Sequence, residues 1–385
     1  MSSGTMERIL RLMADKKASD VYLTANAPAM IKINGQVIPI NSQVLPSEAP
    51  RNLLSEIVPA TRMEELLETG ELNMGVTLEG LGNYRVSAMR QRGSIAVVIR
   101  YVPSDIPPLD TLNVAPILAD LVMDKRGLIL MVGATGAGKS TTLAAMIDHR
   151  NERVSGHILT VEDPIEYTYR NKRSVVNQRE IGPDTVSLQT ALKNALRQAP
   201  DVILIGEIRD RETMSAAIAY AQSGHLVLAT LHANNSYHAL NRILSFYPVE
   251  VRPTMLGDLA AALRAIVSQR LLRTPVGGRL PAMEVLLNTA LIADLIQKAD
   301  FSGVREAMEK SLAEGSQTFE QDLARLIHEG LVTREEGLAQ ADSPNNLLWR
   351  LQNDFAPSAA RGAEAADEDA TDTPSFTEFT LDVKF

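Results

Sequence analysis

The pattern of apolar and polar positions divides the chain into two differently built regions. Apolar residues at helical spacing over residues 6–20 are followed by short runs that alternate with polar residues, and Asn34-Gly35 is typical of a hairpin turn between two such runs. A helical pair is expected around Glu48–Glu68, and three further strands at Met74–Leu78, Tyr84–Met89 and Ile95–Tyr101. The pattern predicts a small α+β domain over residues 6–101.

After a proline-rich linker at residues 102–114, helical segments alternate with continuous apolar runs. The runs predicted to be buried strands are Leu128–Val132, Ile158–Val161, Val202–Ile205 and Leu226–Thr230. Such alternation predicts an α/β fold for residues 115–251, with a largely parallel sheet and helices on both faces. Residues 252–355 are predicted to be mostly helical and to close the same domain.

The last thirty residues differ in composition from the rest of the chain. Residues 356–375 are rich in alanine, proline and acids without apolar periodicity, which predicts a disordered segment. The end of the chain, PSFTEFTLDVKF, regains an alternating apolar pattern. Residues 356–385 are therefore expected to be an acidic tether whose end is either a docking motif, suited to pairing along a sheet edge, or an apolar tail without a partner.

Composition narrows the class of protein. The 385 residues carry a formal net charge of −9 and no cysteine, which excludes disulfides and thiolate zinc sites and gives a nucleic-acid partner little support. No apolar run reaches the length of a membrane span, and the N-terminus has no signal-peptide pattern. We expect a cytoplasmic protein without a transmembrane segment, in which any membrane association runs through a partner.

A phosphate-binding loop follows the first predicted strand of the second region. The sequence fits GxxxxGK[ST], with an apolar strand before it and a helix-forming segment after it. Glycines allow successive backbone N–H groups to face phosphate oxygens, the lysine supplies a charge for the β- and γ-phosphates, and the serine hydroxyl can bind Mg²⁺. The predicted nucleotide-binding residues are Gly133, Ala134, Thr135, Gly136, Ala137, Gly138, Lys139, Ser140 and Thr141.

Two carboxylates follow predicted strands. Glu207 ends the Val202–Ile205 strand after Gly206, in the Walker B form, where a carboxylate can reach Mg²⁺ or the attacking water. Glu162 ends the Ile158–Val161 strand, and from the residues alone it is equally a metal-site carboxylate or a loop acid.

Two histidines bracket the strand Leu226–Thr230. His225 and His232 lie seven residues apart, an odd interval that puts the two rings on opposite faces and argues against a shared metal ion. One core histidine and one surface histidine explain the pattern as well as a functional pair does.

Four segments carry a resemblance to a known family. The segments GATGAGKSTTLAAMI, ILTVEDPIEY, ALRQAPDVILIGEIRDRETM and GHLVLATLHANN resemble the Walker A, Asp box, Walker B and His box of secretion ATPases, and among these the PilT/PilU-type ATPases that retract type IV pili. The resemblance runs from about Met6 to Leu351. It implies a hexameric ring whose subunits join a PAS-like N-terminal domain to a RecA-like motor domain that hydrolyses ATP with Mg²⁺.

The resemblance also implies roles for individual residues. Glu207 corresponds to the catalytic Walker B glutamate, Glu162 with Glu166 beside it to the Asp-box carboxylates, and His232 with its companion His225 to the His box. Arginines of the N-terminal domain reach the nucleotide in this family, and Arg85 and Arg100 fall at matching places, with Arg90 and Arg92 less securely aligned. Mg²⁺ is implied at Ser140, with Glu162 acting through water.

Departures from the family pattern favour a PilU-like accessory motor. The segment Ser19-Asp-Val-Tyr-Leu23, the segment 301–308 and the extended tail differ from PilT. The implied partners are a PilT-like retraction ATPase ring and the pilus platform protein of the inner membrane. The alternatives are a type II/IV secretion traffic ATPase, which the missing cysteines and short N-terminal region disfavour, a RecA-like nucleic-acid motor, and a regulatory subunit that binds ATP but hydrolyses it poorly.

Overall fold

The computed structural model describes residues 4–16, 18–33, 36–78, 82–102, 105–310 and 313–354. The predicted Asn34-Gly35 turn and the predicted tail at residues 356–385 lie outside the described residues. Within the described ranges, no helix is both long and apolar enough to cross a membrane.

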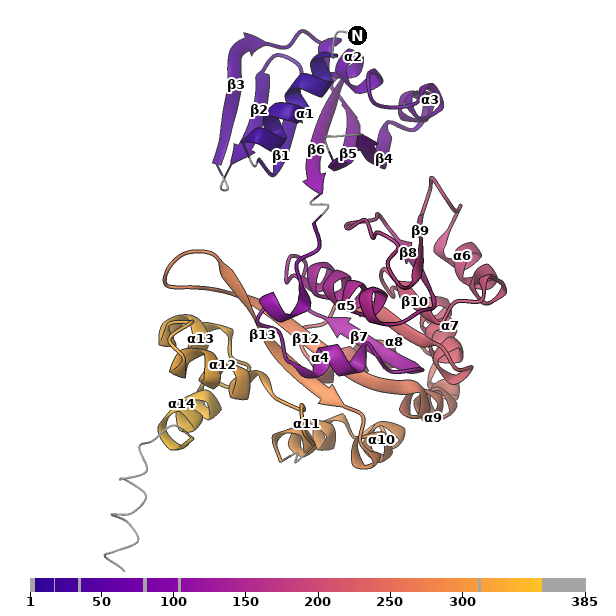
Figure 1. Cartoon of the computed structure of the whole chain (residues 1–385), viewed down its shortest axis with the longest axis vertical. Helices are drawn as coiled ribbons and strands as arrows, with labels where there is room; N and C mark the ends of the chain where they lie inside the picture. The colour runs from indigo at the N-terminus through magenta and orange to yellow at the C-terminus, as the bar shows by residue number, and fades with distance from the viewer. Residues whose placement is uncertain are drawn as a thin grey trace, which may run out of the picture. The chain divides into compact units, whose positions relative to one another are not determined.

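The N-terminal region forms a six-stranded sheet in the order β3-β2-β1-β6-β5-β4, whose neighbouring strands are all antiparallel. Apolar side chains of three helices and of the strands form one core, which confirms the predicted α+β region. Its elements, labelled in Figure 1, are α1 (Thr5–Asp15), β1 (Asp20–Leu23), β2 (Pro28–Ile33), β3 (Gln36–Val44), α2 (Ala49–Ser55), α3 (Ala60–Thr69), β4 (Glu71–Leu78), β5 (Gly82–Gln91) and β6 (Ser94–Val102).

The second region is built on a seven-stranded sheet in the order β13-β12-β7-β11-β10-β8-β9, in which the pairs from β12 to β9 are parallel. Its first elements are η1 (Leu109–Thr111), α4 (Ile117–Leu121), β7 (Gly127–Val132), α5 (Lys139–Arg153), β8 (His157–Glu162), β9 (Val175–Glu180), α6 (Leu188–Ala195), η2 (Leu196–Gln198), β10 (Val202–Ile205), α7 (Arg211–Gln222) and β11 (Leu226–Leu231). The chain continues through α8 (Ser236–Ser245), η3 (Val249–Val251), α9 (Arg252–Ala262), β12 (Leu263–Arg273), β13 (Arg279–Leu287), α10 (Ala290–Gln297) and α11 (Phe301–Glu309).

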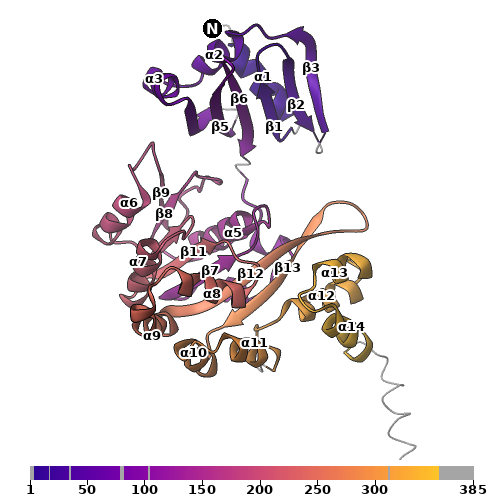
Figure 2. The same cartoon turned by 180° about the vertical axis from the view of Figure 1, so that it is seen from behind.

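Alternate residues of the central strands enter different cores, which explains why these strands are apolar throughout. In β7, Leu128, Leu130 and Val132 pack on one face, where helices α7 to α11 contribute side chains. Ile129 and Met131 pack on the other face, with side chains of α4 and α5. Figure 2 shows these helices from the side opposite to Figure 1. The predicted α/β fold with a parallel-rich sheet covered on both faces is confirmed.

The predicted helical C-terminal part is confirmed, but it contains two strands that the sequence pattern did not predict. Helices occupy both ends of the range 252–355, but residues 263–273 and 279–287 form the long strands β12 and β13. The run LRAIVSQRLLR has no clean period of two, because β12 pairs with β7 through a register shift and is buried on both faces. Its strand conformation depends on the neighbouring β7, which propensity in the sequence does not reveal.

Among the described residues, 272–278 and 319–354 form a second compact unit. Its helices are α12 (Phe319–His328), α13 (Arg334–Gln340) and α14 (Pro344–Asn353). Thr333 and Ser343 cap α13 and α14 by accepting hydrogen bonds from the backbone N–H groups of Glu336 and Asn346. This helical end agrees with the predicted closing subdomain.

Candidate active site

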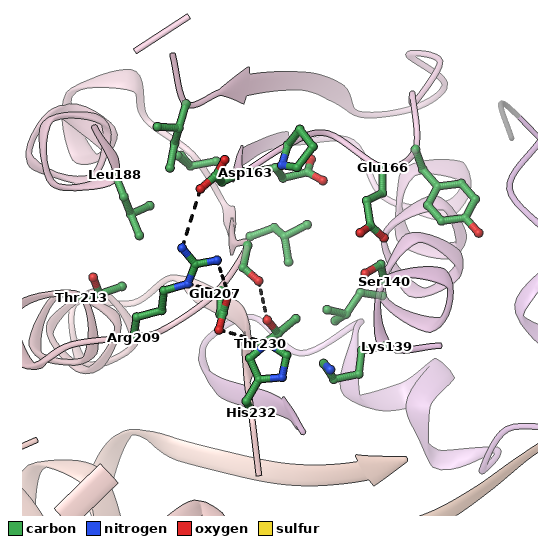
Figure 3. Close-up of a pocket in the computed structure, with 18 of the residues that line it drawn as sticks. Lys139, Ser140, Asp163, Glu166, Leu188, Glu207, Arg209, Thr213, Thr230 and His232 are labelled. Atoms are coloured by element: carbon green, nitrogen blue, oxygen red, sulfur yellow. Dashed lines mark hydrogen bonds and ion pairs between the residues drawn. The ribbon is translucent and has the colours of Figure 1, made fainter. Parts of the chain in front are cut away.

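A pocket of about 490 Å³ opens at the carboxyl edge of the seven-stranded sheet. Parallel strands present their carboxyl ends at one edge, so segments that follow β7, β8, β10 and β11 meet there. Figure 3 shows Lys139 and Ser140 on one side of this pocket and Glu207, Arg209 and His232 across from them. The sequence-predicted residues that line it are Arg85, Thr135, Gly136, Lys139, Ser140, Glu162, Glu166, Glu207 and His232.

The loop between β7 and α5 has the backbone that a phosphate cradle requires. Gly133, Gly136 and Gly138 adopt positive φ angles of 152°, 80° and 84°. A Cβ atom on Gly133 would lie 2.5 Å from the carbonyl oxygen of Gln269, and one on Gly138 would lie 2.8 Å from its side-chain nitrogen. The glycines therefore provide both the turn and the close approach of this loop to β12.

Lys139 begins α5 and is 8% exposed. Its Nζ atom donates hydrogen bonds to the carbonyl oxygens of Gly133 at 2.8 Å and Ala134 at 2.9 Å. Burial lowers the pKa of the Lys139 ammonium group, and the nearby carboxylates of Glu207 and Glu166 act in the opposite direction. A cation held here beside the helix N-terminus favours a polyanionic ligand.

Gln269 on β12 holds the loop and the start of α5 in place through two hydrogen bonds. Its amide nitrogen donates to the carbonyl oxygen of Ala137 at 2.8 Å, and its amide oxygen accepts from the hydroxyl of Thr142 at 2.8 Å. The sequence prediction missed this residue, because it expected residues 252–355 to be mostly helical and named no strand there. Gln269 is 2% exposed, so both bonds are shielded from water.

Replacing Gln269 by alanine is expected to lower the free energy of unfolding by about 2 kcal/mol, because it leaves a buried carbonyl and a buried hydroxyl without partners. ATP affinity should fall as well, since the loop loses its support. Urea denaturation and equilibrium binding measure the two effects. Gln222→Ala, at an exposed glutamine of α7, is the matched control and should cost less than about 0.5 kcal/mol. Equal effects of the two substitutions would contradict this role of Gln269.

Glu162 ends β8 within the pocket. Its Oε1 atom accepts hydrogen bonds from the hydroxyl of Thr160 at 2.7 Å and from the amide of Gln178 at 3.3 Å. Burial raises the pKa of the Glu162 carboxyl, and these two hydrogen bonds act against that rise. Of the two interpretations left open by the sequence, this location favours a site carboxylate over a loop acid.

The Glu207 carboxylate lies between the side chains of Arg209 and His232. Its Oε2 atom accepts from Nε of Arg209 at 2.7 Å and lies 2.6 Å from Nη2 of the same guanidinium, while Oε1 lies 3.1 Å from Nε2 of His232. Arg209 also approaches Asp163, with 3.8 Å between Nη1 and Oδ2. Sequence reasoning did not single out Arg209, although its place two residues after Glu207 in the same motif was a usable signal.

The structure does not bring His225 to the pocket, so its predicted role as a site residue is corrected. His225 precedes β11 and His232 follows it, and the carboxyl ends of the parallel strands form the site. The ring of His225 contacts the carbonyl oxygen of Tyr220 and the hydroxyl of Ser223, each at 3.2 Å. One histidine of the pair thus lies in the pocket and the other outside it.

The structure places the four arginines considered in the sequence at different locations relative to the pocket. Arg85 lines the pocket, whereas Arg100, its cross-strand partner on β6, pairs with Asp20 at 2.7 Å and does not line it. Arg90 donates to the carbonyl oxygen of Leu67, and Arg92 forms the turn between β5 and β6 with a positive φ of 45°. Of the four arginines, only Arg85 is placed to reach a ligand in this pocket.

The donor atoms of the pocket fit Mg²⁺. The hydroxyl of Ser140 and the carboxylates of Glu162, Glu166 and Glu207 supply the oxygen ligands that this ion prefers. Among the residues that the structure describes, no three His, Cys, Asp or Glu side chains group closely enough to hold a metal by themselves. Mg²⁺ at this site would therefore depend on phosphate oxygens and water, as it commonly does beside nucleotides.

Comparison with known proteins finds similarity along most of the chain. Residues 5–336 match the family described as "Type II/IV secretion system protein". The type IV pilus ATPase PilU of Pseudomonas aeruginosa is 47% identical over 347 residues, which cover 90% of this chain and 91% of that protein. The type IV pilus retraction ATPase PilT of the same bacterium is 35% identical, over 88% of this chain and 98% of that protein.

Solved structures of two related ATPases are similar in fold to this chain. The pilus retraction motor PilT with bound ADP has a TM-score of 0.84 at 36% identity and covers 90% of this chain and all of that one. The ATPase DotB of Legionella pneumophila has a TM-score of 0.77 at 27% identity, over 87% of this chain and 94% of that one.

Proposed function

Because the chain belongs to the type II/IV secretion system protein family, we propose that it is an ATP-hydrolysing motor that powers retraction of type IV pili, in the role of PilU. The observation that carries the proposal is the pocket, where a phosphate-binding loop with Lys139 and Ser140 faces Glu207 and His232. The alignment with PilU extends over nine-tenths of both chains and so includes the four segments that follow β7, β8, β10 and β11 at the pocket.

The loop residues 133–141 bind the phosphates of ATP in this proposal. Backbone N–H groups at the start of α5 face the phosphate oxygens, and Lys139 supplies its charge to the β- and γ-phosphates. Ser140 would hold Mg²⁺, with Glu162 and Glu166 near enough to act through water. When bound, the ion neutralises charge on the phosphate oxygens.

Hydrolysis is assigned to Glu207 as the base. It orients a water molecule and takes its proton as the water oxygen bonds to the γ-phosphorus and the bond to the ADP oxygen breaks. His232, on the same carboxylate, links this base to the state of the γ-phosphate. Arg85 neutralises charge that spreads over the phosphoryl oxygens during transfer.

The proposal includes a hexameric ring at the cytoplasmic face of the inner membrane, with a PilT-like ring and the pilus platform protein as partners. It also makes residues 6–101 and 115–355 the PAS-like and motor domains of each subunit, joined by the linker at 102–114. The similarity to PilU and PilT over most of their lengths supports these assignments.

Replacing Arg85 by alanine should lower ATP turnover by roughly a hundredfold or more, because a guanidinium at the transferring phosphoryl group contributes on the order of 10³–10⁵ in rate where it has been measured. Arg100→Ala is the matched comparison, since it lies opposite Arg85 in the same sheet and pairs with Asp20. Phosphate release by the purified full-length protein measures both. If Arg85→Ala keeps the wild-type rate, the role of Arg85 is wrong. If Arg100→Ala is equally impaired, Arg100 also serves a nucleotide, as the family resemblance implied.

A steady-state ATPase assay combined with sizing of the purified full-length protein tests the proposal. We expect Mg²⁺-dependent ATP hydrolysis and a particle of roughly 250 kDa, for six chains of 41.9 kDa. Absence of hydrolysis in preparations of that size would favour the alternative of a regulatory subunit that only binds ATP.

A further inference from the structure

The carboxylate of Glu207 uses most of its hydrogen-bonding capacity on two side chains. A carboxylate offers about four lone-pair positions, two on each oxygen. Both nitrogens of the Arg209 fork meet Oε2, and His232 meets Oε1. One acceptor position on Oε1 is left, so the contacts select the atom and the direction that Glu207 can present to another ligand.

Hydrogen bonds of the flanking residues and a buried side chain fix the segment that carries Arg209. The side chain of Ile208 is fully buried, and its N–H group donates to the carbonyl oxygen of Thr230 at 2.9 Å. Glu207 and Arg209 flank this buried residue, and both line the pocket. Asp210 then caps α7 by accepting from the backbone N–H of Thr213 at 2.8 Å.

The environment of Arg209 argues for a role in the site and against a role in the core. Its side chain is 62% exposed, so truncating it removes little packing. Asp163 approaches the guanidinium from the side away from Glu207, and Figure 3 shows Arg209 between the two carboxylates. The hydrogen bond with Glu207 raises the pKa of Arg209, so the fork stays charged.

We propose that Arg209 is a positioning residue for ATP hydrolysis, which holds Oε2 of Glu207 so that Oε1 alone faces the attacking water. Asp163 keeps the guanidinium in place, and His232 occupies the second position on Oε1. The inference rests on the proposed role of Glu207 as the base. A planar guanidinium suits this task better than a lysine ammonium, because its Nε and Nη2 donors lie in one rigid plane and converge on Oε2.

The test compares Arg209→Ala, Arg209→Lys and Arg209→Gln with the wild-type protein, all full length, in steady-state ATPase assays. Arg209→Ala should lower kcat by roughly ten- to hundredfold with KM for ATP nearly unchanged, because misplacing a reacting group affects the chemical step. Arg209→Lys should recover only part of the loss. Millimolar guanidinium should raise kcat of Arg209→Ala several-fold, which a structural role for the side chain does not predict. Arg305→Ala, at a similarly exposed arginine of α11, should match the wild-type protein with and without guanidinium.

The inference is overturned if Arg209→Ala keeps the wild-type kcat, or if guanidinium has no effect on kcat of the variant. It is also overturned if KM for ATP, instead of kcat, changes by roughly ten- to hundredfold. A smaller particle for both Arg209→Ala and Arg209→Gln would assign the residue to ring assembly and overturn it as well. Glu207→Gln distinguishes a failure of the inference about Arg209 from a failure of the proposed role of Glu207 as the base. If Glu207→Gln is inactive and Arg209→Ala is not impaired, only the inference about Arg209 fails, whereas an active Glu207→Gln removes the proposed base itself.

Discussion

Glu207→Gln is expected to bind ATP as tightly as the wild-type protein, within a few-fold, and to lose roughly 10²–10⁴ in turnover, the range that a positioned general base contributes. The amide has the size of the carboxylate and still offers an oxygen acceptor, so the pocket keeps its shape. It cannot take a proton from water, and it carries no charge to pair with Arg209 or a protonated His232.

Phosphate release and binding of a fluorescent ATP analogue measure the two properties separately. Glu212→Gln, at an exposed carboxylate in the first turn of α7, is the matched control and should behave as wild type. Wild-type turnover by Glu207→Gln would show that another group activates the water. Loss of ATP binding together with turnover would show instead that Glu207 serves the ligand and not the chemistry.

Lys139→Ala should weaken ATP binding by roughly tenfold to more than a hundredfold, because a hydrogen bond to a charged group contributes about 1.5–3 kcal/mol and each 1.4 kcal/mol is a factor of ten. The substitution also removes the donor that the carbonyl oxygens of Gly133 and Ala134 share. Turnover should fall with binding, because the β- and γ-phosphates lose their counter-charge.

Lys193→Ala is the control for this experiment, since it removes an exposed lysine from α6 and should leave binding unchanged. Thermal unfolding followed by circular dichroism should show that Lys139→Ala retains the fold. A folded variant that binds ATP with wild-type affinity would contradict the placement of phosphates at this loop.

The parts of the fold that follow from local rules were predictable from the sequence. The strands β7, β8, β10 and β11 are continuous apolar runs because both of their faces are buried, and this pattern is visible without a structure. The loop after β7 was predictable because only glycine fits a positive φ beside β12. Strands β12 and β13 were not, because β12 depends on its pairing with β7, β13 lies beside β12, and both pack between two cores.

The same distinction holds for the site. Lys139, Glu162 and Glu207 were found because each stands at a fixed place after a strand. Gln269 was missed because it reaches the loop from a part of the chain more than a hundred residues away. The strand direction could have placed His225 away from the pocket, since His225 precedes β11 and the pocket opens at the carboxyl edge of the sheet. The pairing of Arg100 with Asp20 required the register of β1 and β6, which no local pattern supplies.

Imaging labelled pili in cells whose own copy of the gene is deleted tests whether ATP hydrolysis in this pocket drives pilus retraction. The cells would carry either the wild-type gene or Glu207→Gln, expressed at equal levels in the presence of the PilT-like motor. We predict that the wild-type gene restores retraction speed and force and that Glu207→Gln does not. Equal retraction with the two genes would contradict the account.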